Sequence, residues 1–285
     1  MVPVPVSLEN ENEGRKCEEM KAKTNKGYEK LKVIYEKNLS VDLLAEDLNT
    51  CNLHDSSPAI KQEMTEKDFD IYGVEENGKV IGYVLRGRLT DGKVEDNYQP
   101  FHSGDLVSDS TSLIELLEIL RNKNYLFVLE RNRVTKIVTL ADLQKQPIRM
   151  LAFSLISLLE MLLISLIREE YPDESWKEKL SKERLNKAEE MLKIRNEKNE
   201  ALTLLDNTQL ADKGTIVVKT DKLTEQLGFE SKSRCKEFFK NIETLRNNTA
   251  HAQEEIYHNS AELIDIILEL DRVLDSNARS ERIPM

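Results

Sequence analysis

An internal repeat constrains the fold of this chain more than any other sequence feature. Four short runs are rich in β-branched and aromatic residues: 69–74, 79–85, 125–130 and 134–139. Asn77-Gly78 separates the first two runs and favours a tight turn with positive φ, which predicts a β-hairpin. A shift of 54 positions superimposes the first pair on the second and aligns Val74 with Val128, Val80 with Val134, Val84 with Val138 and Leu89 with Leu143. The sequence therefore predicts two copies of one small α+β motif.

A helical run is predicted before each hairpin, most clearly at residues 112–120, which follow the helix-start signal Ser108-Asp109-Ser110. The order helix, strand, strand, helix occurs twice and resembles a tandem pair of CBS domains, the modules that sense adenine nucleotides. Thr139-Leu140-Ala141-Asp142 matches the T-x-x-D signature of that family. The first copy departs from the signature, because Leu85 and Arg88 stand at the equivalent positions. The resemblance therefore implies a nucleotide site in the second copy.

The resemblance implies AMP, ADP or ATP as a regulatory ligand. Asp142 would accept hydrogen bonds from the ribose hydroxyls, while the Thr139 hydroxyl and nearby helix-start amides would meet a phosphate. The purine would lie between apolar strand edges near Val107, Phe127 and Val138. A purely structural alternative stays open, since threonine and aspartate at a helix start also serve as an N-cap.

A second motif, Leu245-Arg246-Asn247-Asn248-Thr249-Ala250-His251, lies in the C-terminal part of the chain. Apolar residues at helical spacing surround it, which predicts amphipathic helices on both sides: Phe238, Phe239, Ile242, Ile256, Leu263, Ile264, Ile267 and Leu268. On one continuous helix, Arg246 and His251 would diverge by roughly 140° and could not face one phosphate. The motif is therefore predicted to sit at a helix junction, or to form a site shared by two chains.

The pattern R-N-x-x-A-H between two amphipathic helices resembles the R-x-x-x-x-H motif of the HEPN family of helical RNases and RNA-binding domains. The resemblance implies a homodimer whose paired motifs cut RNA without a metal. His251 would act as general base or acid, Arg246 would stabilise charge on phosphorus, and Asn247 would orient the phosphate or the imidazole. In the alternative interpretation, Arg246 pairs with Glu243 and His251 merely starts a helix.

The length of 285 residues, with 39% hydrophobic and 33% charged residues, suits a highly charged globular protein of two domains. We predict a polar, partly helical segment at 1–38, a tandem CBS-like nucleotide-sensing module at 39–148 and a HEPN-like helical domain at 149–285. The fold class is thus an α+β CBS pair of short sheets and helices, followed by an all-α bundle. Within the bundle we expect helices at 150–170, 176–199 and 201–210, with a break at 213–218.

The net charge of −11 argues against broad electrostatic affinity for nucleic acid. An RNA site must therefore be local, and the helix before the motif is net positive because five basic residues outnumber two acidic ones: Lys232, Arg234, Lys236, Lys240 and Arg246 against Glu237 and Glu243. This helix face is interpreted either as an RNA track or as an ordinary solvated surface.

Three cysteines without metal-ligand spacing indicate neither a disulfide framework nor a zinc site, so no metal is expected. A cytoplasmic protein is expected, since the chain start does not resemble a signal peptide. The apolar stretch Leu151–Ile167 is shorter than the roughly 20 residues that span a bilayer and is interpreted as a buried core or dimer helix, with no membrane association.

These features favour a metal-independent endoribonuclease that is regulated by an adenine nucleotide. Two alternatives remain open. A non-catalytic sensor could bind RNA or a protein partner, which the acidic charge favours and the Arg246–His251 pair disfavours. A toxin could instead be silenced by a separate antitoxin or regulatory chain.

Overall fold

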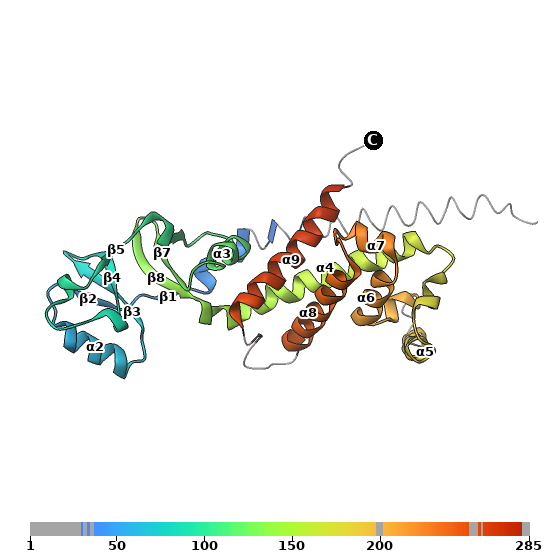
Figure 1. Cartoon of the computed structure of the whole chain (residues 1–285), viewed down its shortest axis with the longest axis horizontal. Helices are drawn as coiled ribbons and strands as arrows, with labels where there is room; N and C mark the ends of the chain where they lie inside the picture. Colours follow the sequence, from blue (N-terminus) through green and yellow to red (C-terminus); the bar gives the residue numbers. More distant parts are fainter. Residues whose placement is uncertain are drawn as a thin grey trace, which may run out of the picture. The chain divides into compact units, whose positions relative to one another are not determined.

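A computed structural model shows that the chain forms two compact units (Figure 1). It describes residues 30, 33–34, 37–197, 202–250, 256–257 and 259–280. The sheet unit is Tyr35–Ile148, and the helical unit is Arg149–Met285 together with Met1–Ile34. The polar segment predicted at 1–38 lies almost entirely outside the described residues.

The sheet unit contains two four-stranded sheets that follow the same plan (Figure 1). The first sheet has the order β2 (Thr50–Asn52), β3 (Ile71–Glu76), β4 (Lys79–Leu85) and β5 (Gln99–Pro100). The second has the order β1 (Glu46–Asp47), β8 (Arg133–Thr139), β7 (Tyr125–Glu130) and β6 (Leu106–Ser108). In each sheet one outer pair is parallel, β2 with β3 and β6 with β7, and the other pairs are antiparallel.

The predicted repeat is confirmed in the two hairpins. The bounds of β7 and β8 lie 54 positions after those of β3 and β4. A register shift follows Val74 in the first hairpin and Val128, at the equivalent position, in the second. Asn77 and Gly78 both have positive φ, 51° and 73°, as a two-residue turn matched to the strand twist requires.

The two copies also exchange their leading segments, which the sequence did not reveal. β1 precedes the first copy but pairs with β8 of the second, whereas β5 precedes β6 and pairs with β4 of the first. The segments that lead into β1 and β5 also make equivalent backbone hydrogen bonds. Before β1, Val41 N donates to Thr111 O and Asp42 N donates to Asp109 O; before β5, Val94 N donates to Asp55 O and Glu95 N donates to Leu53 O. Each copy is therefore completed by a segment that precedes the other in the chain.

Helices precede both hairpins as predicted, α2 at Ser57–Glu66 and α3 at Leu113–Leu120. The helix predicted after the first hairpin is wrong, because a three-residue 3₁₀ turn, η2 (Arg86–Arg88), stands there. Leu89 follows it in extended conformation with only 1% of its surface exposed, so the chain turns into the core instead of continuing the helix. After the second hairpin, η5 (Leu140–Gln144) leads into a long helix.

Gly82 marks a close approach between β4 and β5. A Cβ at this position would lie 2.3 Å from the backbone oxygen of Gln99 and 2.9 Å from the Tyr98 ring. We expect Gly82→Ala to lower the free energy of unfolding by about 1–3 kcal/mol, because the strands must separate to admit the methyl group. Gly87→Ala is the matched control, since nothing lies within 4 Å of its Cβ position. Equal melting temperatures for the two variants in calorimetry would contradict this packing.

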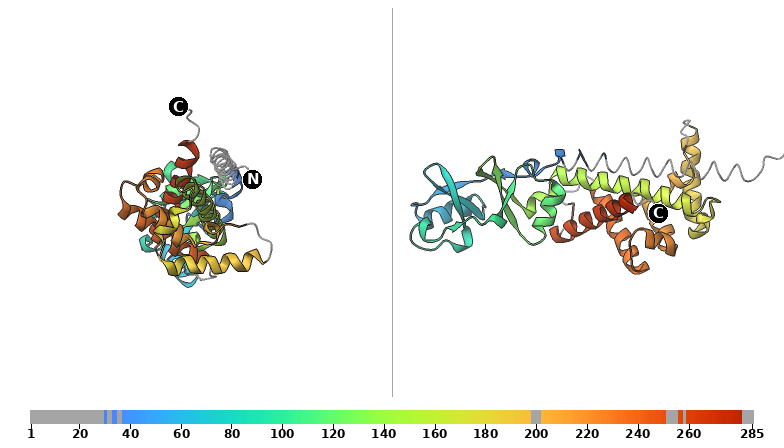
Figure 2. Two further views of the ribbon diagram at one scale, coloured as in Figure 1. Left: turned by 90° about the vertical axis from the view of Figure 1, so that its right-hand side faces the viewer. Right: turned by 90° about the horizontal axis from the view of Figure 1, so that it is seen from above.

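In its described residues, the helical unit contains five longer helices and three shorter elements: α4 (Gln146–Glu170), η6 (Ser175–Lys179), α5 (Lys182–Asn196), η7 (Leu205–Asn207), α6 (Leu210–Val218), α7 (Asp221–Gln226), α8 (Lys232–Ala250) and α9 (Ser260–Ser280). In Figures 1 and 2, α8 and α9 lie beside α4, and α5 projects from the other helices. The apolar positions predicted around the motif are buried, with Phe238 1% exposed and Ile242, Leu263 and Ile267 fully covered. The predicted amphipathic helices are confirmed.

Three helix predictions in this unit need correction. The helix predicted at 176–199 is divided, because η6 ends at Lys179 and the Ser181 hydroxyl caps a new helix, α5. The helix predicted at 201–210 is wrong within the described residues, where only η7 and the start of α6 occur. The break predicted at 213–218 lies inside α6, which starts where the Asp212 carboxylate accepts the backbone N–H of Gln209.

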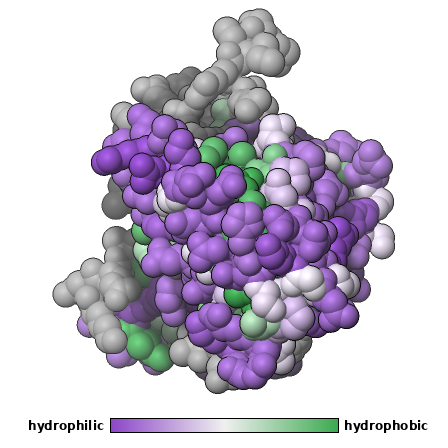
Figure 3. Space-filling view, turned by 90° about the vertical axis from the view of Figure 1, so that its left-hand side faces the viewer, coloured by the Kyte–Doolittle hydropathy of each residue, from purple (hydrophilic) through white to green (hydrophobic). Residues whose placement is uncertain are grey.

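The apolar helix α4 is longer than the stretch Leu151–Ile167 that its composition indicated. Its 25 residues are enough by length and composition to cross a membrane, but 61% of the apolar window is buried within the protein. Such burial is typical of a core helix. Three large apolar side chains of α4 remain exposed, Met150 (58%), Phe153 (57%) and Met161 (46%). By contrast, the face drawn in Figure 3 is mostly hydrophilic, with small hydrophobic areas.

Candidate functional sites

Thr139 and Asp142 form a compact cap at the end of β8. The Asp142 carboxylate accepts the backbone N–H of Thr139 at 2.6 Å and the Thr139 hydroxyl at 2.9 Å, both on Oδ2. Asp142 is 6% exposed. This arrangement is the capping box that starts η5. One carboxylate oxygen is therefore already engaged in holding the local backbone.

Lys145 completes this group and was not identified from the sequence. Its ammonium lies 2.6 Å from Asp142 Oδ1 and donates to the Leu44 carbonyl at 2.7 Å and to Glu46 Oε1 at 2.8 Å. Burial opposes the charged form, but the hydrogen bonds to Asp142 and Glu46 outweigh it and raise the pKa of Lys145. A ribose hydroxyl that binds Asp142 Oδ1 must therefore displace or share this lysine. Its i,i+3 spacing from Asp142 is the sequence signal that could have found it.

The three apolar residues predicted to hold a purine do not share one face of the second sheet. Phe127 packs with Tyr83 and Val134 in the cluster that joins the two sheets. Val138 pairs with Leu126, and Val107 pairs with Val128, the two strand neighbours of Phe127. Because successive side chains of a strand alternate, Val107 and Val138 lie on the opposite face from Phe127. A purine beside Phe127 therefore cannot also contact these two valines from the same side.

Aromatic rings and a buried amide lie where the sheets of the unit meet. Tyr83 packs against Phe101 with a 20° angle between rings, and against Phe127 at a centroid distance of 4.7 Å. The Tyr83 hydroxyl donates to Gln99 Oε1 at 3.2 Å and accepts from the Tyr125 hydroxyl at 3.4 Å. Burial raises the pKa of Tyr83, so this hydroxyl stays protonated. In the described part of the chain, the Gln99 Nε2 donor is buried without a hydrogen-bond partner.

The aromatic rings lie next to the Thr139 cap in the β7–β8 hairpin. Tyr125 is the cross-strand partner of Thr139 in the β7–β8 hairpin. In the first copy the equivalent positions differ, since Leu85 is partly buried and Arg88 is exposed in a short 3₁₀ turn. Of the two copies, the second therefore combines a carboxylate cap with a cation and neighbouring aromatic rings.

In the helical unit, Arg246 and Asn247 lie exposed in the last turn of α8. Arg246 Nη1 donates to Asn247 Oδ1 at 3.3 Å. Within the described residues Arg246 makes no ion pair, so the alternative in which it pairs with Glu243 is wrong. The helix runs continuously through Arg246 and ends at Ala250, and α9 begins at Ser260. His251 lies outside the described residues.

The basic residues of α8 fall into two groups. Lys232 pairs with Asp221 at 2.6 Å, and Arg234 pairs with Glu237 at 2.8 Å and with Glu269 at 3.1 Å. Lys236 and Lys240 are exposed and form no ion pair with any residue that the structure describes. The local positive charge is therefore smaller than the sequence count, and the basic residues of α8 without an ion pair among the described residues are Lys236, Lys240 and Arg246.

The part of the chain that the structure describes contains neither a metal-binding group nor a reactive cysteine. No group of three or more His, Cys, Asp or Glu side chains there could hold a metal ion. Cys51 and Cys235 are free and buried. Burial raises the pKa of Cys51 to about 12 and that of Cys235 to about 11, which keeps both thiols protonated and unreactive at neutral pH.

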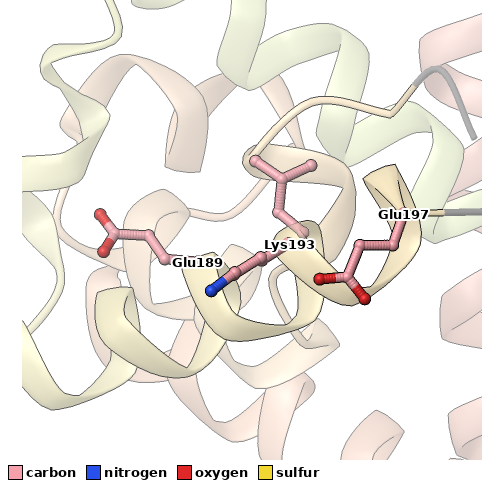
Figure 4. A pocket seen from close by; sticks show the side chains of 4 residues that line it. Glu189, Lys193 and Glu197 are labelled. Carbon is pink, nitrogen blue, oxygen red and sulfur yellow. The ribbon is translucent and has the colours of Figure 1, made fainter. Parts of the chain in front are cut away.

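A surface hollow on α5 is not a candidate site. Glu189, Leu192, Lys193 and Glu197 line it; the first three lie on α5, and Glu197 directly follows its last residue. Figure 4 shows Glu189, Lys193 and Glu197 along that helix. Among the described residues, no second element supplies a convergent group, as a binding site normally requires.

Comparison with known proteins finds similarity to solved structures only. No family model and no curated protein matches the sequence. The matching structures include CBSX2 in complex with AMP, which is 17% identical over 40% of this chain and 98% of that chain, with a TM-score of 0.36. A putative acetoin utilization protein (AcuB) from Vibrio cholerae is 16% identical over 40% and 93% of the two chains, with a TM-score of 0.35. A CBS domain protein, TA0289, from Thermoplasma acidophilum is 17% identical over 38% and 68%, with a TM-score of 0.33.

Proposed function

We propose that the sheet unit is a CBS-type pair that binds an adenine nucleotide and thereby regulates an RNA-cleaving helical unit. The observation that carries the regulatory half is the Thr139–Asp142 cap, in which the two residues of the T-x-x-D motif bond to each other beside the partly buried ammonium of Lys145. Aromatic rings suit a purine, and the buried Gln99 amide offers a donor that the described residues leave unused. Ribose hydroxyls would bind Asp142, and Lys145 would turn toward a phosphate.

The catalytic half of the proposal concerns the end of α8. Arg246 and Asn247 are exposed there and joined to each other, with no carboxylate of the described chain competing for the guanidinium. Such a guanidinium is free to hold a phosphate with two parallel hydrogen bonds. His251 follows within the same motif and supplies an imidazole, a group that can accept or donate a proton.

The proposed reaction is an intramolecular transfer within RNA. The ribose 2′-oxygen attacks the adjacent phosphorus and the bond to the 5′-oxygen breaks, which leaves a 2′,3′-cyclic phosphate. His251 accepts the proton of the 2′-hydroxyl, and the His251 of a second copy donates a proton to the departing 5′-oxygen. Arg246 stabilises the charge that develops on the phosphoryl oxygens, while Asn247 orients the guanidinium.

The second copy is expected to dock on the exposed face of α4. Met150, Phe153 and Met161 project from it, and the hydroxyls of Ser154 and Ser157 between them bond backward to the Met150 and Phe153 carbonyls at 2.8 and 2.9 Å. The serines therefore leave no unsatisfied donor on a surface that another apolar helix could cover.

Light scattering should find a dimer at micromolar concentration, and Phe153→Asp should convert it to a monomer. Ile194→Asp on α5 is the matched control, because Ile194 is 50% exposed but lies outside this face. A monomeric wild-type protein would remove the basis for a site shared by two motifs.

The decisive test of the whole proposal is incubation of purified protein with mixed RNA in excess chelator, with and without AMP, ADP and ATP. We expect cleavage that survives the chelator and products that end in a cyclic phosphate. RNA binding without cleavage would favour the non-catalytic sensor. Activity that a co-purified chain suppresses would favour the antitoxin-controlled alternative.

A further inference from the structure

Among the described residues, hydrogen bonds from Arg149 and Asn248 hold the end of α8 that carries Arg246 and Asn247. Arg149 Nη1, near the start of α4, donates to the backbone oxygen of Asn248 at 3.3 Å. The Asn248 side chain in turn donates from Nδ2 to the backbone oxygen of Ile256 at 2.8 Å. The start of α4, the end of α8 and the chain that follows α8 therefore meet at one residue of the motif.

The contact from Arg149 satisfies a group that the helix cannot satisfy itself. The last four carbonyls of an α-helix have no intrahelical partner, and Asn248 stands in the final turn of α8. A guanidinium at this end also complements the negative end of the helix dipole. Arg149 is only 8% exposed, so packing holds its side chain in place against α8.

The contact from Asn248 anchors the chain beyond the end of α8. Ile256 is fully buried, and the hydrogen bond to its carbonyl ties it to a residue eight positions earlier. Asn248 directly follows Asn247. Any change in the hydrogen bonds from Arg149 and to Ile256 therefore moves the guanidinium of Arg246 and its amide partner, Asn247. Neither of these two hydrogen bonds uses the guanidinium of Arg246 or the amide of Asn247, so the role argued from them is one of geometry.

We propose that Arg149 and Asn248 are positioning residues that set the place of Arg246 and Asn247 for the phosphate. The inference rests on the proposed RNA cleavage and deepens it. The same residues indicate how a nucleotide could regulate cleavage. Arg149 lies seven residues after Asp142, and α4 begins between them at Gln146. A nucleotide that changes the hydrogen bonds of Asp142 and Lys145 acts on the segment that leads directly into the helix of Arg149.

The test uses the full-length chain with Arg149→Gln, Arg149→Lys and Asn248→Asp. Asn248→Asp keeps the size of the side chain but removes the donor to Ile256. Under saturating RNA we expect Arg149→Gln and Asn248→Asp to lower kcat by about ten- to a hundredfold with little change in KM, the scale of a displaced catalytic group. Arg149→Lys should restore part of kcat, because an ammonium can still reach a helix carbonyl.

Arg168→Gln is the matched control. Arg168 also lies on α4 and donates to Asp206 at 2.8 and 2.9 Å and to Thr203 at 2.7 Å, away from the motif. Its loss should lower the melting temperature but leave kcat unchanged. A purely structural role for Arg149 would give the same pattern as Arg168→Gln, and that result would overturn the inference.

Hydrogen exchange separates this inference from the proposed function. The amides of residues 246–250 should exchange faster in Arg149→Gln and Asn248→Asp than in wild type or Arg168→Gln. If wild-type protein cleaves no RNA, the proposed function fails. The exchange rates still decide whether the hydrogen bonds of Arg149 and Asn248 hold this end of α8. Unchanged exchange in both variants would overturn the inference whatever the activity.

Discussion

RNA cleavage should fall by about two to four orders of magnitude when either His251 or Arg246 is replaced by alanine, the usual scale for loss of a general acid or base or of a transition-state charge partner. Arg246 is exposed, and its side chain bonds only to Asn247 among the described residues. Its removal should therefore leave the fold intact. The rate is measured by single-turnover cleavage of labelled RNA, and folding by circular dichroism.

Arg234→Ala is the control for the loss of a positive charge on α8. Arg234 is exposed on the same helix but pairs with Glu237 and Glu269, so its charge is already compensated. It should change cleavage by a few fold at most. If Arg246→Ala and His251→Ala fold and cleave RNA like wild type, the assigned site is wrong.

Asp142→Ala should abolish nucleotide binding by the sheet unit. The substitution removes the proposed ribose acceptor, frees the Thr139 hydroxyl and leaves Lys145 without one of its three acceptors. In wild type, a nucleotide at a hundred times its Kd should stabilise the fold by about 2.7 kcal/mol, because the ligand binds only the folded state. Calorimetry of the variant should show neither heat of binding nor a shift in melting temperature with nucleotide.

Asp96→Ala controls for the structural part of this effect. Asp96 accepts the backbone N–H of Lys93 at 3.0 Å in a capping box of the same kind, in the segment that leads into β5. Its loss should lower the melting temperature of the free protein but preserve the shift that nucleotide causes. A nucleotide response that survives Asp142→Ala would exclude this carboxylate as the ribose acceptor.

Local patterns explain which parts of the fold could be predicted. The hairpins rest on Asn77-Gly78 and on runs of β-branched residues, and both signals act between neighbours in sequence. The exchanged strands β1 and β5 were missed because two residues carry no periodicity, and their hydrogen bonds reach partners such as Ile137 and Tyr83 far along the chain.

The start of α6 was missed for a similar reason. Lys213-Gly214 resembles a break, but Phe239 of α8 lies where a Gly214 side chain would be, at 2.8 Å from the Cβ position. Glycine therefore permits close helix packing here, and tertiary contact overrides its weak helix propensity.

The candidate sites were predictable only in part. The T-x-x-D motif identified Thr139 and Asp142, whose mutual hydrogen bonds depend on residues three positions apart. Lys145 with Glu46, and Gln99 with Tyr83, come together only through the exchanged segments. Val107 and Val138 lie on the other face of the sheet from Phe127, which the sequence did not reveal, because local patterns locate the strands but do not say which side of the sheet meets the other copy.

The most direct test of the central claim is the rate of RNA cleavage as a function of adenine-nucleotide concentration, compared between wild type and Asp142→Ala. We predict that the wild-type rate changes with nucleotide, is half-maximally altered at the Kd measured by calorimetry and saturates well above it, because the ligand must favour one arrangement of the protein over another. Asp142→Ala should cleave at a constant rate across the same range. A wild-type rate that is independent of nucleotide, or a variant that responds like wild type, would contradict nucleotide control through this site.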